Sequence, residues 1–133
     1  MKLHLNKDSN ILLIRGYQNG RISIGDDTYS RSVILSPGRL IDDWSPLTLN
    51  DLTENDFELM LELEPEVVLL GTGLRLRFPD RAITRPLIQR SIGVEVMDTA
   101  AACRTYNVLA NEGRNVVASL IIETTAVLQP GQV

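Results

Sequence analysis

The sequence predicts one small α/β domain in which an N-terminal β meander precedes a mixed sheet packed against helices. Its 133 residues are close to the commonest size of a single domain, and 44% of them are hydrophobic. A chain of this size buries enough apolar surface to form a core without disulfides or metal ions. Strand-like segments joined by turns fill the first third, and helix-like and strand-like segments alternate after it.

The meander opens with a hairpin signal. Asn19-Gly20 separates an apolar strand at 11–17 from a strand of alternating polar and apolar residues at 21–24. Both turn residues tolerate the positive φ angles of a type I′ turn, which makes this a strong prediction of a hairpin. Strand residues within 29–36 continue the meander, which Pro37-Gly38 ends.

The middle of the chain predicts a helix followed by two strands. Thr53 has the character of a helix N-cap, and Pro65 stops the helix that it begins. The uninterrupted apolar run 67–70 is typical of a strand buried on both faces, as in a parallel or mixed sheet. Large apolar side chains alternate with arginines over 74–78, which predicts a half-buried strand there.

Capping residues mark the elements of the last third. Asp98 is a strong helix N-cap, and Gly113 suits the left-handed position that follows a helix. The predicted elements are a short helix after Thr84 with Pro86 in its first turn, a strand at 94–97, a helix from Thr99 to about Asn111, and a last strand at 116–122.

The composition argues against several classes of activity. Acidic residues outnumber basic ones by 17 to 13, and a net charge of -4 disfavours sequence-independent binding of nucleic acid. One cysteine, Cys103, and one histidine, His4, cannot supply a structural zinc site, and we expect no cofactor. The chain has neither a Gly-x-Ser-x-Gly motif nor a P-loop. Without a signal peptide or an apolar run of about 20 residues, we expect a cytoplasmic protein with no transmembrane segment, able to reach a membrane through a partner.

Three features of the second half have both a structural and a functional interpretation. Gly71-Thr72-Gly73 follows a strand, as dinucleotide-binding loops do, but the strand pattern of 74–78 replaces the expected helix and favours a tight turn. Asp98 is favoured as a helix cap over a catalytic acid. Cys103 shares its helix face with Tyr106, which favours a buried small hydrophobe over a reactive thiolate near the helix start.

Three further polar residues lie close to these features. Arg104 and Asn107 fall on the helix face away from Cys103, where they form either a solvated surface, which we favour, or a contact for a partner or an anion. Glu95 points to the opposite side of its strand from Val94 and Val96. If the Glu95 carboxylate pairs with an arginine, the pair either has a structural role or forms the floor of a pocket.

Charge is distributed unevenly along the chain. Residues 42–66 hold many carboxylates and no lysine or arginine. Five arginines then follow with only Asp80 against them, namely Arg75, Arg77, Arg81, Arg85 and Arg90. These segments are either two solvated surfaces that pair across the fold, which we favour, or one acidic and one basic docking surface.

Several ungapped blocks resemble one protein family. They are PEVVLLGTG at 65–73 and GVEVMDTAAACRTYNVL at 93–109, closed by Glu112-Gly113-Arg114, and Trp44 also lies where such proteins carry a tryptophan. The family has no established biochemical function and includes the mitochondrial NADH dehydrogenase (complex I) assembly factors and the adipogenesis-associated domain proteins. The resemblance covers the C-terminal half closely and the N-terminal half in general layout. It implies a single-domain β/β/α layered fold and, in some members, a part in assembling membrane complexes, but no enzyme activity.

Two hypotheses for function follow. The first is a non-enzymatic interaction or assembly-factor-like protein, whose partner is a protein such as a membrane-complex subunit. The second is a small-molecule-binding protein or an unrecognised enzyme, with a pocket where strand ends meet a helix start. The candidate residues for a pocket or an interaction are Gly71, Thr72, Gly73, Glu95, Asp98, Cys103, Arg104 and Tyr106. The sequence does not specify an oligomeric state.

Overall fold

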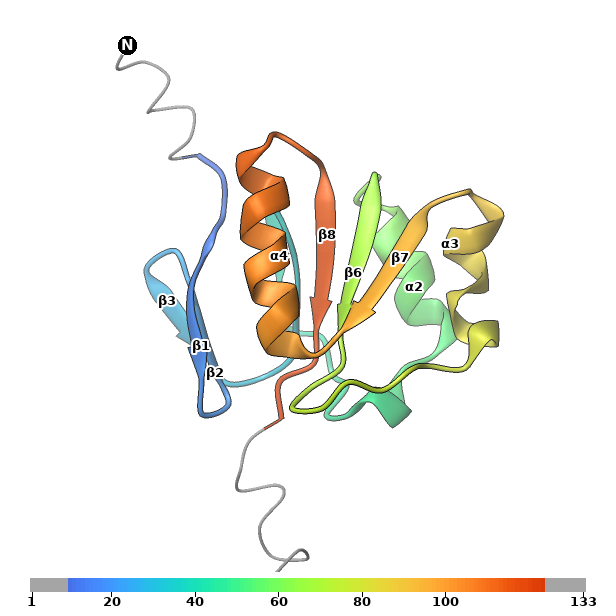
Figure 1. Ribbon diagram of the computed structural model, residues 1–133, viewed down its shortest axis with the longest axis horizontal. Coiled ribbons are helices and arrows are strands. Elements are labelled where there is room, and N and C mark those ends of the chain that lie inside the picture. Colours follow the sequence, from blue (N-terminus) through green and yellow to red (C-terminus); the bar gives the residue numbers. More distant parts are fainter. Residues whose placement is uncertain (1–9, 124–133) are drawn as a thin grey trace, which may run out of the picture.

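Two β-sheets and a set of helices form the fold in the computed structural model, which describes residues 10–123 (Figure 1). His4 lies outside the described residues. The smaller sheet has the order β1-β2-β3 and the larger one the order β5-β4-β8-β6-β7. The strands are β1 (Ile14–Gln18), β2 (Arg21–Ile24), β3 (Asp27–Tyr29), β4 (Val33–Ser36), β5 (Arg39–Ile41), β6 (Val67–Gly71), β7 (Gly93–Met97) and β8 (Val116–Leu120).

The small sheet is the antiparallel meander that the turn residues predict. Asn19 and Gly20 connect β1 to β2 with φ angles of 54° and 74°, so both adopt the left-handed conformation of a type I′ turn. Ile14, Ile22 and Ile24 are buried on the side that faces the rest of the protein. The predicted hairpin is therefore confirmed.

The large sheet is mixed, and β6 lies inside it. β6 pairs in parallel with β7 on one side and β8 on the other, whereas β8 pairs antiparallel with β4. Val68, Leu69 and Leu70 are fully buried, as the uninterrupted apolar run predicts. Parallel neighbours require connections that cross a face of the sheet, and helices make these crossings.

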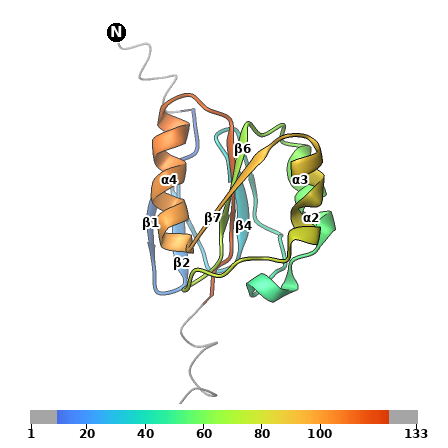
Figure 2. The ribbon, with the colours of Figure 1, turned by 45° about the vertical axis from the view of Figure 1, so that its right-hand side comes forward.

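The helices cover the two faces of the large sheet (Figure 2). They are η1 (Leu49–Asp51), α2 (Glu54–Leu61), η2 (Arg81–Thr84), α3 (Arg85–Gln89) and α4 (Thr99–Asn111). α4 and the small sheet pack on one face, and α2 and α3 on the other. Trp44 is buried on the α2 side, where its Nε1 donates to Asp56 Oδ1 at 2.9 Å. The predicted class, an α/β fold with a mixed sheet packed against helices, is confirmed.

The caps of α4 are those that the sequence predicts. Asp98 Oδ1 accepts a hydrogen bond from the backbone N–H of Ala101 at 2.8 Å, which satisfies a free donor of the first turn. Gly113 follows the helix with a φ angle of 83°. These caps fix the start of α4 directly after the end of β7.

The predicted strand at 74–78 is wrong. The structure assigns no strand there, and Leu74, Leu76 and Phe78 are exposed to 41%, 52% and 73%. The Thr72 hydroxyl donates to the Arg75 carbonyl at 2.6 Å and accepts from the Arg77 N–H at 3.2 Å, so this backbone curls around one side chain. In addition, β7 and β8 occupy both sides of β6, which leaves no place beside it for a further strand.

Candidate functional site

The Gly71-Thr72-Gly73 turn follows the carboxyl end of β6 and lies against the start of α4. Gly73 N–H donates to Thr99 Oγ1 at 2.8 Å, and Thr99 N–H donates back to the Gly73 carbonyl at 3.0 Å. The Thr99 hydroxyl donates in turn to the Ile121 carbonyl at 2.7 Å, and Thr72 N–H to the Met97 carbonyl at 2.9 Å. This network ties together three strand ends and the first turn of a helix.

Neighbouring atoms fill the space beside both glycines. A Cβ atom on Gly71 would lie 3.0 Å from Thr99 Cα. Gly73 has a φ angle of 106°, and a Cβ atom there would collide with the carboxylate of Glu123. Glu123 is buried, and its Oε1 accepts the Leu74 N–H at 2.8 Å. The packing thus favours the tight-turn interpretation of the glycines over a ligand-binding loop.

Cys103 and Tyr106 lie in the core under α4. Burial raises the pKa of the Cys103 thiol to about 12, and the opposing effect of Arg104 is smaller. The thiol is therefore protonated at neutral pH, which does not suit a nucleophile. Tyr106 is fully buried, its hydroxyl donates to the Leu12 carbonyl at 2.7 Å, and burial raises the pKa of its phenol.

The other candidate residues of the predicted pocket separate in space. Arg104 is exposed on α4, and Glu95 is exposed on β7. Among residues 10–123, no ion pair involves Glu95. Asp98 serves as the cap of α4. Consequently, Gly71, Thr72, Gly73 and Asp98 lie together at the strand ends, whereas Glu95, Arg104 and the two core residues do not share that location.

Asn107 does not lie on a solvated face, contrary to our expectation. It is half-buried, and its Oδ1 accepts the Ile14 N–H at 2.9 Å while its Nδ2 donates to the Ile14 carbonyl at 2.7 Å. The side chain thus bridges α4 to the first residue of β1. Sequence reasoning missed this role because the partner lies 93 residues away.

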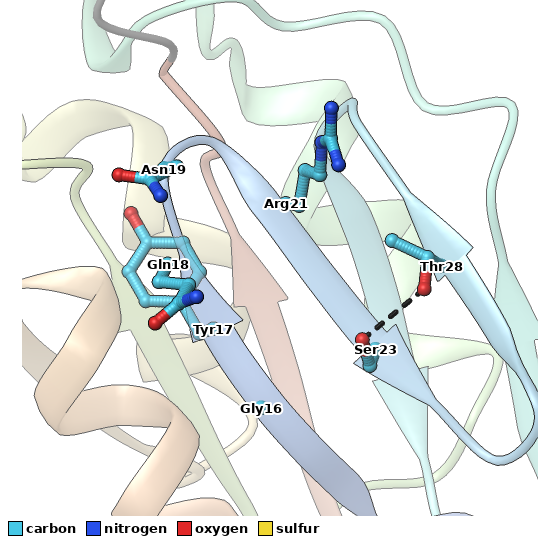
Figure 3. Close-up of a pocket in the computed structure, with 7 residues that line it drawn as sticks. All are labelled: Gly16, Tyr17, Gln18, Asn19, Arg21, Ser23 and Thr28. Carbon is cyan, nitrogen blue, oxygen red and sulfur yellow. Dashed lines mark hydrogen bonds between the residues drawn. The ribbon is translucent and has the colours of Figure 1, made fainter.

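Shallow hollows lie beside the small sheet, and two of them share Tyr17. One, of about 590 Å³, lies over β1, β2 and β3, where Ser23 and Thr28 side chains are hydrogen-bonded at 3.2 Å (Figure 3). The other, of about 240 Å³, lies between β1 and α4 beside Cys103 and Arg104. Tyr17 contributes to both, and its buried hydroxyl has no hydrogen-bond partner among the described residues. Burial raises the pKa of Tyr17, and the negative charges of Glu123 and Asp98 add to this effect.

The five clustered arginines are exposed and form no ion pair within residues 10–123. The two ion pairs of this part of the chain join Arg15 to Asp26 at 3.7 Å and Arg114 to Glu66 at 3.2 Å. Arg77 donates instead to the neutral side chain of Asn50 at 3.2 Å. In the described structure, none of these arginines forms an ion pair with the acidic segment 42–66, although Arg90 lines a hollow together with Glu54, Glu58 and Glu62 of that segment.

Large apolar side chains are exposed among these arginines. Leu74, Leu76 and Phe78 belong to the loop after β6, and Ile88, exposed to 59%, belongs to α3. We call these four residues together with Arg75, Arg77, Arg81, Arg85 and Arg90 the basic–apolar surface. The alternation of leucine and arginine was a visible signal for this surface, but the same pattern also predicts a strand.

An apolar groove of about 480 Å³ lies at one side of this surface, against β7. Phe78 and Ile88 contribute to it together with Val94 and Val96 of the strand. Arg81 also lines the groove, so apolar and cationic groups meet there. An extended, mixed surface of this kind fits a macromolecular partner better than an enclosed small ligand.

The described residues supply neither a metal site nor a membrane-spanning helix. Within 10–123, no three His, Cys, Asp or Glu side chains are grouped closely enough to hold a metal ion. No helix in this range has the length and apolar character that crossing a membrane requires.

Comparison with known proteins gives consistent matches. The chain is 44% identical over 80 residues to the Bos taurus NADH dehydrogenase [ubiquinone] 1 alpha subcomplex assembly factor 3, a match that covers 59% of this chain and 44% of that protein. It is 28% identical over 122 residues to the 13 kDa major membrane protein of Francisella tularensis, covering 91% of this chain and 99% of that protein. A crystal structure of a Bordetella parapertussis protein superposes with a TM-score of 0.79 and 35% identity, covering 85% of this chain and 97% of that chain.

These matches confirm the family resemblance seen in the sequence blocks. The chain spans less than half the length of the bovine assembly factor, so the similarity concerns one portion of that protein. A family profile matches a longer stretch, residues 14–121, which includes both sheets and all the helices described. The chain belongs to the family described as protein of unknown function DUF498/DUF598.

Proposed function

We propose that this protein is a non-enzymatic, assembly-factor-like module that binds a protein partner through the basic–apolar surface. The single observation that carries the proposal is the exposure of four large apolar side chains among five arginines without ion pairs in the described structure. The names of the relatives add support, since several are assembly factors of the NADH dehydrogenase 1 alpha subcomplex.

The chemistry of the surface suits a protein interface. Aromatic residues and arginine are enriched at such interfaces, and a few of them provide most of the binding free energy. Phe78, exposed to 73%, is the most exposed large hydrophobic side chain of the described residues. Contact with a partner would remove this apolar area from water, which stabilises the complex by about 25 cal/mol for each Å² buried.

The charges suggest which partner would bind. Arginines attract carboxylates, so the complementary surface is expected to carry Asp and Glu beside apolar side chains. By analogy with the relatives, the partner would be a subunit of a membrane complex. The protein would then act at the membrane through that subunit, from the cytoplasmic side.

Affinity purification from detergent-solubilised native cells tests the proposal. The wild-type protein, a Phe78→Glu/Ile88→Glu variant and a Val108→Glu variant are tagged and compared by quantitative mass spectrometry with an untagged control. Val108 is the matched control because it is exposed to 56% but lies on α4, on the opposite face of the large sheet from α3. We expect the wild type and Val108→Glu to enrich the same membrane-complex subunits and the double variant to lose them.

Two results would contradict the proposal. If the wild type enriches no partner over the untagged control, the interaction function is wrong. If the double variant retains the partner fully, another surface of the protein binds it.

A further inference from the structure

The outer edge of β7 is free to pair with another strand. β7 is the last strand of the large sheet and pairs only with β6 among the described residues. The Met97 carbonyl accepts the Thr72 N–H at 2.9 Å, so the polar backbone groups of Met97 point toward β6. Because these groups alternate in direction along a strand, those of Glu95 also point toward β6, while the N–H and C=O groups of Val94 and Val96 point outward.

This edge lacks most of the features by which proteins usually protect open strands, and its one charged side chain is the exposed Glu95. Natural edges are blunted by proline, bulges, charged side chains (lysine above all) or a very short length. β7 has five residues, contains no proline or lysine, and pairs with β6 in an uninterrupted register from Gly93 to Met97. The outer strands β3 and β5 have only three residues each, and on β1 both backbone groups of Ile14 are bonded to Asn107.

The apolar groove lies where a strand added to β7 would place its side chains. A new strand would run about 4.8 Å from β7, and every second side chain would point to the face that carries Val94 and Val96. That face holds the groove of about 480 Å³, with Phe78, Ile88 and Ile92 among its lining residues. Backbone pairing combined with pockets for alternate side chains is the usual mode of strand addition to an exposed sheet edge.

The arginines define the charge of the added segment. Arg81 lines the groove itself. Arg75, Arg77, Arg85 and Arg90 belong to the same connection between β6 and β7, and Arg90 lines a separate hollow beside Glu54, Glu58 and Glu62. None of the five has an ion pair within residues 10–123. A segment with a carboxylate next to its apolar residues would complement Arg81, whereas a second copy of this chain would bring a like-charged arginine to the same groove.

We propose that β7 accepts an extended segment of a protein partner as a sixth strand, with apolar side chains at alternate positions in the groove and an Asp or Glu opposite Arg81. This inference rests on the proposed function, because it requires a protein partner at the basic–apolar surface. It goes further by naming the backbone edge, the mode of binding and the chemistry of the bound segment.

Hydrogen exchange of the complex tests the backbone pairing. The tagged wild-type protein is purified with and without its partner, and the exchange of single amides is followed by mass spectrometry with electron-transfer fragmentation. We expect the Val94 and Val96 amides to exchange at least about tenfold more slowly in the complex, since a bonded amide opens only with the added strand. The Glu95 and Met97 amides point toward β6 and serve as internal controls that change little.

Photo-crosslinking identifies the bound segment. A photoreactive phenylalanine replaces Phe78 in one protein and Val108 in a control, and cross-linked peptides are sequenced. We expect Phe78 to capture a partner peptide with alternating apolar residues and flanking carboxylates, and Val108 to capture none from that partner. A Val96→Pro variant removes an outward N–H without removing a bond to β6, and should reduce partner recovery by about tenfold.

The outcomes separate this inference from the proposed function. Recovery of the partner with unchanged exchange at Val94 and Val96 overturns strand addition and leaves the interaction function standing. Cross-links from Phe78 to another copy of this chain overturn the choice of occupant. Failure of the wild type to recover any partner overturns both proposals. If Val96→Pro does not fold, as judged by circular dichroism, the exchange and cross-linking results on the wild-type backbone still decide.

Discussion

Replacing Asn107 by alanine tests whether this side chain anchors the small sheet to α4. Its amide accepts the Ile14 N–H at 2.9 Å and donates to the Ile14 carbonyl at 2.7 Å. Ile14 is buried at the start of β1, so alanine would leave both of its backbone groups without their partner. No other residue described makes both contacts, so nothing in the fold replaces the bridge.

The expected loss of stability follows from these two contacts. An unsatisfied buried donor or acceptor costs about 1 to 3 kcal/mol. Both contacts are only partly buried, and water can reach them after truncation, so we take the lower part of that range for each. The free energy of unfolding should therefore fall by about 2 to 3 kcal/mol, a large fraction of the 5 to 15 kcal/mol that is typical of a domain.

Urea unfolding followed by tryptophan fluorescence measures this loss. Trp44 is the only tryptophan in the chain and is buried, so its emission reports unfolding directly. Arg104→Ala is the matched control, because Arg104 lies on the same helix and is exposed. A loss below about 0.5 kcal/mol for Asn107→Ala, equal to that of the control, would refute the bridging role.

Three further predictions concern single residues. Gly73→Ala should lower the free energy of unfolding by about 2 to 4 kcal/mol, because of its positive φ angle and the collision with Glu123, whereas Gly25→Ala, with open space around it, should cost less in the same urea titration. The Cys103 thiol, with its pKa raised to about 12, should react with Ellman's reagent at pH 8 only as fast as the protein opens, and rapid labelling of the native protein would contradict its burial. Hydrogen bonds from the Asn115 backbone and Arg114 lower the pKa of Glu66 below its ordinary 4.5, so its contribution to stability is present above that pH and is lost as the pH falls through the folded-state pKa. The wild type should therefore be more stable than Glu66→Gln at pH 7, and the gap between their melting temperatures should shrink as the pH falls to 3. A gap that stays constant with pH would argue against this pairing.

Elements whose signals are local could be predicted from the sequence. The Asn19-Gly20 turn is fixed by the conformations that these two residues tolerate, and Asp98 caps α4 through a contact three residues away. The buried strand β6 follows from an apolar run that only a covered sheet can accommodate. In each case the deciding interaction lies within a few residues or depends on hydrophobicity alone.

Features that depend on distant partners could not be predicted in this way. Alternation over 74–78 is compatible with a strand, but the sheet has no vacancy beside β6, and Thr72 holds the loop in another conformation. The helix pattern places Asn107 on the face that is expected to be solvated. Only the position of β1 in the fold allows its side chain to link α4 to Ile14. The sequence around Glu123 gives no sign of its role, because that role is a hydrogen bond to the loop after Gly73, 49 residues away.

The candidate site shows the same division. The arginine cluster is visible in the sequence, but whether its charges are neutralised is decided by the positions of residues 42–66 in the fold. Exposure of Phe78 likewise depends on the absence of the predicted strand. The sequence therefore indicates the composition of the basic–apolar surface but not its availability to a partner.

The two crossover connections show why that surface calls for a functional explanation. α4 fills nearly all of the connection from β7 to β8, and it buries Ala102, Cys103 and Tyr106 against the sheet. The connection from β6 to β7 makes the corresponding crossing on the other face with α3, a helix of only five residues. Its remaining length includes the loop 74–78, whose large apolar side chains contribute little to either core cluster. Because topology requires only a crossing and the core gains little from this loop, the exposure of its apolar and cationic groups supports the proposal that a partner binds there.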